Sequence, residues 1–558
     1  MISKRINNLK NFSLFIILLS FLFSNAQSII SFQQKIAQGQ GNSRNYFENI
    51  LDVNYFFNNG LYLFTQLEYS NPPLLGLETK KISDINNIFY LQYSNSNYDL
   101  TLGDLYILHG SGLSLHTYSD QDVDYDNSIM GIDFSYNIND KINFSSMIGT
   151  GNIKSRVDIN EIGHDVSIKN DVISIKGTLD LEKVSVYYLS FFQNQNYSNN
   201  DIESMESMLN LLGKYLNSII IDDTKNYQMK NIDHNIGVHF YFDFADIYIE
   251  QSVVFHDLIF GERVDGYRKY LSTTFDLFNI DFIYEYKDYF IPYLYNVFSA
   301  PPIAFRESTS ILASRNLHTI DFTNEYGYQI EFNKSFNNGA NLRGTYAYAL
   351  HHQKTEISGD FYNDIVLDDT YPYMQYFIEF SNWSNNQKSY YRIGYDYYNE
   401  KPIEKGKFIT AETIPMQYVY NFKKGNSITV YMEIQEKMEE HKLYNEDEVV
   451  IFDGHINHDY YYLSPTYSHY GLWTYSLFFD LEKDYMIPIL EDGTGEIISI
   501  DNEGENWYAM DFTKNLKNSA QISIFYGSQK GGLICANGTC VPQPDFQDGI
   551  KLTFRKNF

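Results

Sequence analysis

The sequence predicts an all-β fold: a transmembrane, antiparallel, up-and-down β-barrel of about 22–24 strands, with long extracellular loops and short periplasmic turns. Three observations support this prediction. The chain begins with an export signal, apolar and polar residues alternate in segments of about ten residues, and short turns alternate with long connections. The 558-residue chain is also rich in aromatic residues, with 51 Tyr and 41 Phe.

The first residues have the features of a secretory signal peptide. A basic stretch precedes an apolar stretch from Phe12 to Phe23, and Ser24-Asn25-Ala26 forms a small-residue cleavage site. The apolar stretch is too short for a membrane-spanning helix, which needs about 20 residues. We therefore predict a signal peptide at 1–26 and one outer-membrane β-barrel at 27–558, located in the cell outer membrane of a Gram-negative bacterium.

Strict alternation identifies the strands, since successive side chains of a strand point to opposite faces of the sheet. The clearest cases are Ile236 to Phe242, Tyr391 to Tyr397, Ile428 to Ile434 and Ala520 to Tyr526. Each has an apolar face suited to lipid and a more polar face suited to a lumen. We expect the first strand at 28–38.

Connections between these segments are of two kinds. Short Asn- and Gly-rich turns lie near Asn58, Asn95, Asn139, Asn337, Ser384, Lys423 and Asn515. Long connections are expected at 71–83, 107–126, 152–170, 195–231, 290–317, 353–371, 439–468 and 529–547. Short turns at one end and long loops at the other are typical of a bacterial outer-membrane barrel.

The C-terminal segment reads as a closing strand. Leu552 and Phe554 alternate with polar residues, and the printed sequence ends on Phe558. We interpret these three residues as the signal that the barrel-assembly machinery recognises. We expect outer-membrane lipid to surround the barrel.

Charge and cysteine usage restrict the partners and cofactors. The net charge of -29 argues against nucleic acid, because phosphate contacts need Lys and Arg. Cys535 and Cys540 flank an Asn-Gly turn and predict a disulfide in an oxidising compartment. Asp120, Asp122 and Asp124 alternate and are weak calcium candidates, but Gly and Glu are missing from the positions that an EF-hand requires. We expect no cofactor.

Several segments together resemble a known family. They are Gly103 to Tyr106, Gly110 to Leu113, Asp126 to Gly131, Asn71 to Gly76, Pro301-Pro302 with Arg306-Glu307, the Cys535 to Cys540 loop and Phe558. Their order resembles that of an uncharacterised outer-membrane protein family of Bacteroidota, a domain-of-unknown-function family. The resemblance implies a barrel in the outer membrane and supplies no activity. Lys556 departs from the apolar or aromatic residue usual at that place.

The candidate functional residues lie in two connections, 107–126 and 290–317, and beside them. In the second, Pro301-Pro302 stiffens the backbone and charged residues follow. We predict that they line the lumen or a constriction; the candidates are Asp104, His109, Asp126, Asn127, Arg306, Glu307, Arg315 and His318. Asp104, His109, Ser111 and His116 lie close in sequence, but no nucleophile elbow accompanies them, so we assign no catalytic residue and no enzymatic activity.

Two functions fit this sequence. The first is a channel or transporter for an unidentified solute; the alternative is a surface receptor or secretion-associated scaffold that binds a partner protein or glycan through its long acidic loops. The positions of 107–126 and 290–317 discriminate between them. Inside the lumen these segments would gate a passage, and outside they would bind a surface partner.

Overall fold

The computed structural model describes residues 29–41, 44–57, 60–70, 82–120, 125–152, 169–197, 227–257, 263–291, 298–305, 310–316, 318, 320–352, 370–402, 407–422, 425–444, 450–489, 501–502, 504–517, 519–536, 539–543 and 545–558. The predicted signal peptide lies outside these ranges. So do Asp122, Asp124, Arg306 and Glu307.

Twenty-four long strands form the wall. They are β1 (Ile29–Gly41), β2 (Arg44–Phe56), β3 (Leu61–Ser70), β4 (Ile82–Ser94), β5 (Tyr98–Leu105), β10 (Ile129–Asn139), β11 (Ile142–Asn152), β12 (Lys169–Asp180), β13 (Val184–Tyr197), β14 (Tyr227–Tyr241), β15 (Ala245–Asp257), β16 (Arg263–Leu277), β17 (Ile280–Phe290), β18 (Asn324–Ser335), β19 (Asn341–Leu350), β20 (Tyr373–Trp383), β21 (Ser389–Glu400), β22 (Ile409–Asn421), β23 (Ser427–Tyr444), β24 (Val450–His469), β25 (Trp473–Ile489), β27 (Asn506–Leu516), β28 (Ala520–Gln529) and β31 (Phe546–Asn557).

In the described part of the connections lie seven short strands and one helix. They are β6 (Leu108–His109), β7 (Leu115–His116), β8 (Ser119–Asp120), β9 (Tyr125–Asp126), β26 (Asp501–Asn502), β29 (Gly532–Ala536), β30 (Thr539–Gln543) and α3 (Ile311–Ser314).

The wall closes on itself, which confirms the predicted fold class. Each long strand pairs antiparallel with the next, and β31 pairs with both β28 and β1. The seam continues to the last residue, where the Phe558 N–H donates to the Phe32 carbonyl at 2.8 Å. Closure removes the unpaired edges that an open sheet would expose to lipid. The first strand, expected at 28–38, is Ile29–Gly41.

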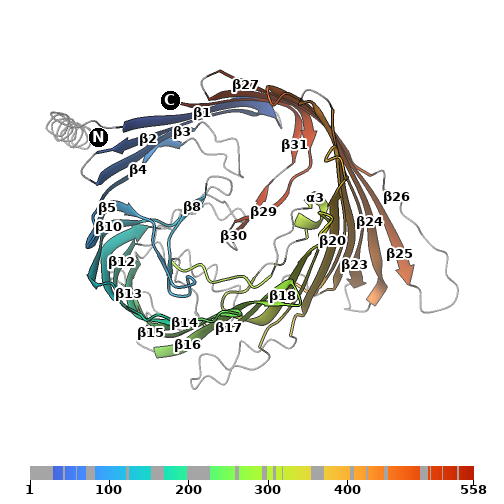
Figure 1. Ribbon diagram of the computed structural model, residues 1–558. Helices are drawn as coiled ribbons and strands as arrows, with labels where there is room; N and C mark the ends of the chain where they lie inside the picture. Colours follow the sequence, from blue (N-terminus) through green and yellow to red (C-terminus); the bar gives the residue numbers. More distant parts are fainter. Residues whose placement is uncertain are drawn as a thin grey trace.

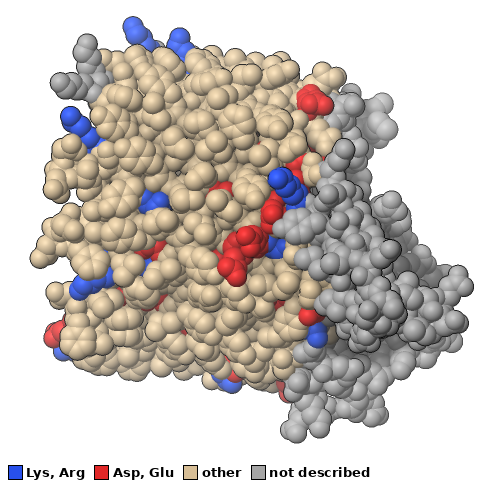
Figure 2. Space-filling view, turned by 90° about the vertical axis from the view of Figure 1, so that its right-hand side faces the viewer, with Lys and Arg blue, Asp and Glu red and all other residues tan. Residues whose placement is uncertain are grey.

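The outward face is apolar. Exposed side chains there include Ile132, Ile148, Ile236, Ile393 and Tyr475. Figure 2 shows the side that carries β23 to β25, where the exterior of the wall is largely uncharged. An outward apolar band around a closed barrel is the signature of a membrane-embedded barrel of the outer-membrane type. Among the described residues, no helix has both the length and the apolar character to cross a bilayer.

Short turns lie at one end of the wall and the long connections at the other, as expected; an exception is the junction of β1 and β2 at the long-connection end, where Gly41 pairs directly with Arg44. The turns predicted near Asn58, Asn95 and Asn139 join β2 to β3, β4 to β5 and β10 to β11, at the end where β31 terminates. One expected loop is wrong: 439–468 is mostly strand, because β23 runs to Tyr444 and β24 begins at Val450. The alternation of apolar residues weakens there, since strands that extend past the lipid need no apolar face.

Among the described residues, the two connections that carry the candidate residues fold into the barrel, and the β29–β30 hairpin lies inside the ring as well (Figure 1). The first inner segment, residues 106–120 and 125–128, joins β5 to β10. The second inner segment, residues 298–305, 310–316, 318 and 320–323, lies between β17 and β18 and contains α3. The buried apolar core lies between these segments and the inner wall. One cluster includes Ile107 and Phe298, and another packs Phe305 against Ala347 and Tyr398.

The outward face predicts an asymmetric response to charge. Ile148 is 56% exposed near the middle of β11. Ile148→Arg places a cation in hydrocarbon and should lower the free energy of unfolding by roughly 2–4 kcal/mol. Thr178→Arg, on the luminal face of the neighbouring β12, is the matched control and should change it little. Denaturant unfolding of the barrel in lipid vesicles measures both; equal effects of the two substitutions would contradict the assigned faces.

Candidate functional site

The first inner segment is attached to the wall by a buried carboxylate. Glu250 of β15 is 1% exposed. Its carboxylate accepts hydrogen bonds from the Ser111 N–H at 2.7 Å and the Ser111 hydroxyl at 2.5 Å. The Asn235 amide and the Tyr248 hydroxyl donate to it as well, each at 2.6 Å. Four donors on one carboxylate compensate for much of the hydration that it loses on burial.

A buried cation holds the same segment one strand further along. Arg268 of β16 is fully buried and donates a hydrogen bond to the Leu113 carbonyl. Next to it, the Asn235 amide donates to the Ser114 hydroxyl at 2.9 Å. Leu113 itself packs against Tyr270 and Tyr289. The tip of the first inner segment is therefore fixed to β14, β15, β16 and β17.

Side-chain hydrogen bonds also fold the first inner segment onto itself. The Asn127 side chain accepts from the Tyr118 N–H at 2.6 Å and donates to the His116 carbonyl at 3.1 Å. The Thr117 hydroxyl accepts from the Ile107 N–H at 2.7 Å and donates to the Leu105 carbonyl at 3.0 Å. These bonds supply the backbone partners that a non-repetitive buried chain lacks.

His318 fixes one part of the second inner segment to the wall. It is 3% exposed and lies between Glu400 of β21, at 2.6 Å, and Glu325 of β18, at 3.1 Å. The ring of Tyr373 stacks on it with a centroid distance of 4.1 Å. Lys287 of β17 forms an ion pair with the same Glu325. Two carboxylates thus share two cations in a buried cluster.

The two carboxylates determine the protonation of His318. Burial alone would lower the pKa of His318, but Glu325 and Glu400 outweigh that effect and raise it to about 9. At neutral pH the imidazole is therefore a cation that donates to both carboxylates. Loss of its proton would leave them facing each other with less compensation.

Glu433 of β23 fixes α3. Its carboxylate accepts from the Ser310 hydroxyl at 2.8 Å, the Ile311 N–H at 2.7 Å and the Leu312 N–H at 2.6 Å. These two N–H groups belong to the first turn, where a helix has no backbone acceptors of its own. Leu312 packs against Tyr460 and neighbouring aromatic rings. A wall residue, in addition to the Ser310 cap, therefore completes this helix terminus.

The end of α3 is attached two strands further along. Arg315 forms a two-pronged ion pair with Asp480 of β25, in which Nη1 lies 3.2 Å from the carboxylate. The Asn316 amide donates to Gln435 of β23 at 3.1 Å, and Gln435 in turn donates to Thr413 at 2.7 Å. The second inner segment is thus anchored from β18 to β25.

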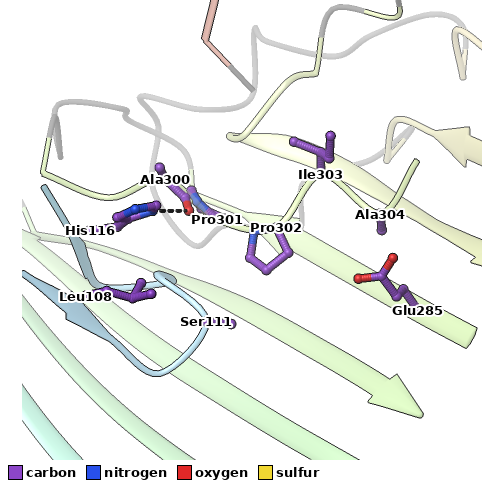
Figure 3. Close-up of a pocket in the computed structure, with 9 residues that line it drawn as sticks. All are labelled: Leu108, Ser111, His116, Glu285, Ala300, Pro301, Pro302, Ile303 and Ala304. Carbon is purple, nitrogen blue, oxygen red and sulfur yellow. Dashed lines mark hydrogen bonds between the residues drawn. The ribbon is translucent and has the colours of Figure 1, made fainter. Parts of the chain in front are cut away.

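The two inner segments meet inside the barrel (Figure 3). The backbone N–H of His116 donates to the Phe298 carbonyl at 2.6 Å. The ring nitrogen Nδ1 of His116 lies 3.4 Å from the Ala300 carbonyl oxygen. Gly112 permits this approach: its φ is +93°, and a Cβ there would lie 2.7 Å from the Ala300 oxygen. A cavity of about 440 Å³ remains between the segments and β17.

The structure places the candidates of the first segment in buried packing. Asp104 accepts from the Phe89 N–H at 2.7 Å, and Asn127 forms the bonds described above. Asp126 accepts from the Ser128 N–H at 2.8 Å. Burial lowers the pKa of His109 to about 3, so it stays neutral. Their assignment to a constriction stays a prediction.

The remaining candidates lie in the second segment or at the C-terminal seam. Arg315 and His318 form the ion pairs with the wall that are described above, whereas Arg306 and Glu307 lie outside the described residues. β29 and β30 bring Cys535 directly opposite Cys540, and the disulfide stays a prediction. In the described part of the chain, no three His, Cys, Asp or Glu side chains gather as metal ligands would.

The assembly-signal candidates lie on the outward face of the closing strand. Leu552 and Phe558 are 38% and 58% exposed. The Lys556 ammonium lies 3.7 Å from the centre of the Phe558 ring, so this basic residue makes a cation–π contact with the terminal aromatic side chain. Their recognition by assembly machinery stays a prediction.

Sequence reasoning missed the wall residues that hold the inner segments, among them Glu250, Arg268, Glu325, Glu400 and Glu433. A local signal was present for Glu433, a carboxylate between the outward-facing Met432 and Ile434. The sequence did not indicate which connection each luminal charge would contact.

The chain belongs to a family of unknown function, DUF6029, whose model matches residues 16–558. No curated protein matches the sequence.

Among solved structures, the chain is similar in fold to several outer-membrane proteins. The copper transporter OprC matches with a TM-score of 0.43 at 9% identity, covering 96% of this chain and 81% of that one. The translocation pore of the P pilus usher PapC matches with 0.41 at 10% identity, covering 95% and 99%. The siderophore receptor PirA from Pseudomonas aeruginosa matches with 0.44 at 5% identity, covering 96% and 81%.

His318 predicts a pH-dependent stability. Its pKa is about 9 in the folded chain and about 6.5 in an unfolded one. The stabilisation, about 3 kcal/mol, is therefore complete below pH 6.5 and lost as the pH rises through 9. Unfolding free energies measured from pH 6 to 10 should fall over this range, and His318→Gln should remove that part of the dependence.

The matched control is His469→Gln, a half-buried histidine at the short-turn end of β24. This variant should keep the pH dependence of the original chain. A flat profile for the original chain, or an undiminished slope in His318→Gln, would contradict the role of the buried cluster.

Proposed function

We propose that the protein is a channel or transporter for small solutes in the bacterial outer membrane, and that the two inner segments set the width of its passage. The observation that carries this proposal is their attachment to the inner wall at Glu250, Arg268, Glu325, Glu400 and Glu433. A barrel of 24 strands encloses a wide lumen. Fixed segments across such a lumen act as a constriction.

Buried anchoring favours a passage over a surface receptor. A receptor needs its binding loops outside, where a partner can reach them. Here 106–120 and 298–305 lie within the ring of strands and pack against its inner face. The chain has 70 acidic and 41 basic residues, and the charges of an outer-membrane barrel face the lumen or the loops. This acidic excess further supports a passage that prefers cations.

Single-channel recording of the refolded chain in planar bilayers tests this function. Discrete conductance steps are expected, with a reversal potential in a potassium chloride gradient that shows cation preference. A folded barrel that never conducts would reject the channel and favour the scaffold alternative.

The anchor at Glu433 predicts a change in conductance. Glu433→Gln turns an amide toward two backbone donors and weakens hydrogen bonds that contribute roughly 1.5–3 kcal/mol each when the acceptor is charged. The α3 region should leave the wall more often, so that open-channel current becomes larger or noisier. Glu436→Gln is the matched control, since Glu436 lies exposed on the outward face of the same strand. Identical currents in the original chain and Glu433→Gln would contradict the gating role.

A further inference from the structure

The cavity between the inner segments combines an apolar lining with one acidic side chain. Leu108, Pro301, Pro302 and Ile303 supply apolar surface, and Glu285 of β17 supplies a carboxylate (Figure 3). Its volume of about 440 Å³ lies within the range of roughly 300–1,000 Å³ that is usual for small-molecule sites. The cavity is therefore large enough for an organic ligand.

Glu285 is held by neutral donors. The Tyr270 hydroxyl donates to one carboxylate oxygen, and the Gln329 amide donates to the other at 3.3 Å. The neighbouring lysines are engaged elsewhere, Lys287 with Glu325 and Lys269 with Asp288. Among the residues that the structure describes, no cationic side chain forms an ion pair with Glu285. Its negative charge is oriented but not neutralised.

His116 supplies a second polar group on the opposite side of the cavity. Its Nδ1 lies 3.4 Å from the Ala300 carbonyl oxygen, an acceptor, and this contact favours the neutral tautomer that carries its proton on Nδ1. In that tautomer Nε2 is an acceptor. With that tautomer the polar groups on two sides of the cavity both accept hydrogen bonds, and a ligand group with several N–H donors satisfies them best.

The lining is also rigid. The Tyr289 hydroxyl donates to the Pro302 carbonyl at 2.7 Å and fixes the proline pair against β17. The Ser111 contacts with Glu250 fix the facing loop. A site whose groups are already in place loses little conformational entropy when a ligand binds.

We propose that this cavity binds organic ammonium compounds, with the ammonium group at Glu285 and a short apolar body against Leu108, Pro302 and Ile303. The inference deepens the proposed function, because it names the solute class that would pause at the constriction. Carboxylate ligands are disfavoured by the charge of Glu285, and uncharged ligands leave it without a counter-ion.

Titration calorimetry of the refolded full chain in detergent micelles tests this site without relying on conduction. Butylammonium chloride is the probe, and sodium butanoate has the same chain with the opposite charge. We expect binding of butylammonium and none of butanoate. Glu285→Gln keeps an acceptor for Tyr270 and should weaken butylammonium binding by about tenfold or more, as loss of a charged hydrogen-bond partner implies.

Asp511→Asn is the matched control. Asp511 of β27 also has neutral donors, Thr513 at 2.9 Å and Ser523 at 2.8 Å, but it is remote from this cavity. Its substitution should leave butylammonium affinity unchanged. Equal weakening by Glu285→Gln and Asp511→Asn would indicate non-specific charge attraction and overturn the proposal.

Leu108→Lys provides a second, independent variant. Leu108 is 56% exposed, so the change leaves the packing intact while it places a cation in the cavity. It should abolish butylammonium binding; unchanged affinity would overturn the site. Binding by a chain that never conducts would reject the channel but retain the site. Conduction without butylammonium binding would reject the site alone.

Discussion

Hydrocarbon cannot hydrogen-bond to a polypeptide backbone, and the rest of this structure follows from that constraint. Every strand must find two neighbours, so β31 returns to β1 and the last residue bonds to Phe32. A ring of 24 strands is wider than its own inward side chains can fill. The chain therefore sends connections inward, among them the two inner segments, and these need polar contacts with the inner wall.

Buried charged side chains make most of these contacts, and each has several hydrogen-bond or ion-pair partners. Glu250, Glu325 and Glu433 are each at most 1% exposed and accept from backbone, hydroxyl or cationic donors of an inner segment. Removing one partner of such a buried carboxylate is costly. The carboxylate has already lost its hydrating water, and it then also loses the protein group that replaced that water. The same chemistry that fastens the segments also makes their position specific: a shifted segment would leave carboxylates unmatched.

The strands of the wall were predictable because the pattern that specifies them lies in neighbouring residues. Alternation placed Tyr391 and Ile393 on one face, and both are outward, 40% and 48% exposed. Asn-rich turns located hairpins within a few residues. The interior was not predictable, because its contacts join residues far apart in the chain: Ser111 to Glu250 across 139 positions and Arg315 to Asp480 across 165. The alternation of a strand indicates that a carboxylate faces inward, but not what it meets there.

The anchors of the second inner segment also have a mechanical consequence. A single-layer sheet bends easily across its strands, so a wide ring can flatten into an oval. Here one stretch of chain is tied to β18 and β21 through His318, to β23 through Glu433 and to β25 through Arg315. The second inner segment thus links separated strands of the wall and holds the curvature from β18 to β25 constant. Lateral pressure on β18 to β25 is therefore transmitted to α3, and the inner segment braces the barrel against deformation by the surrounding bilayer.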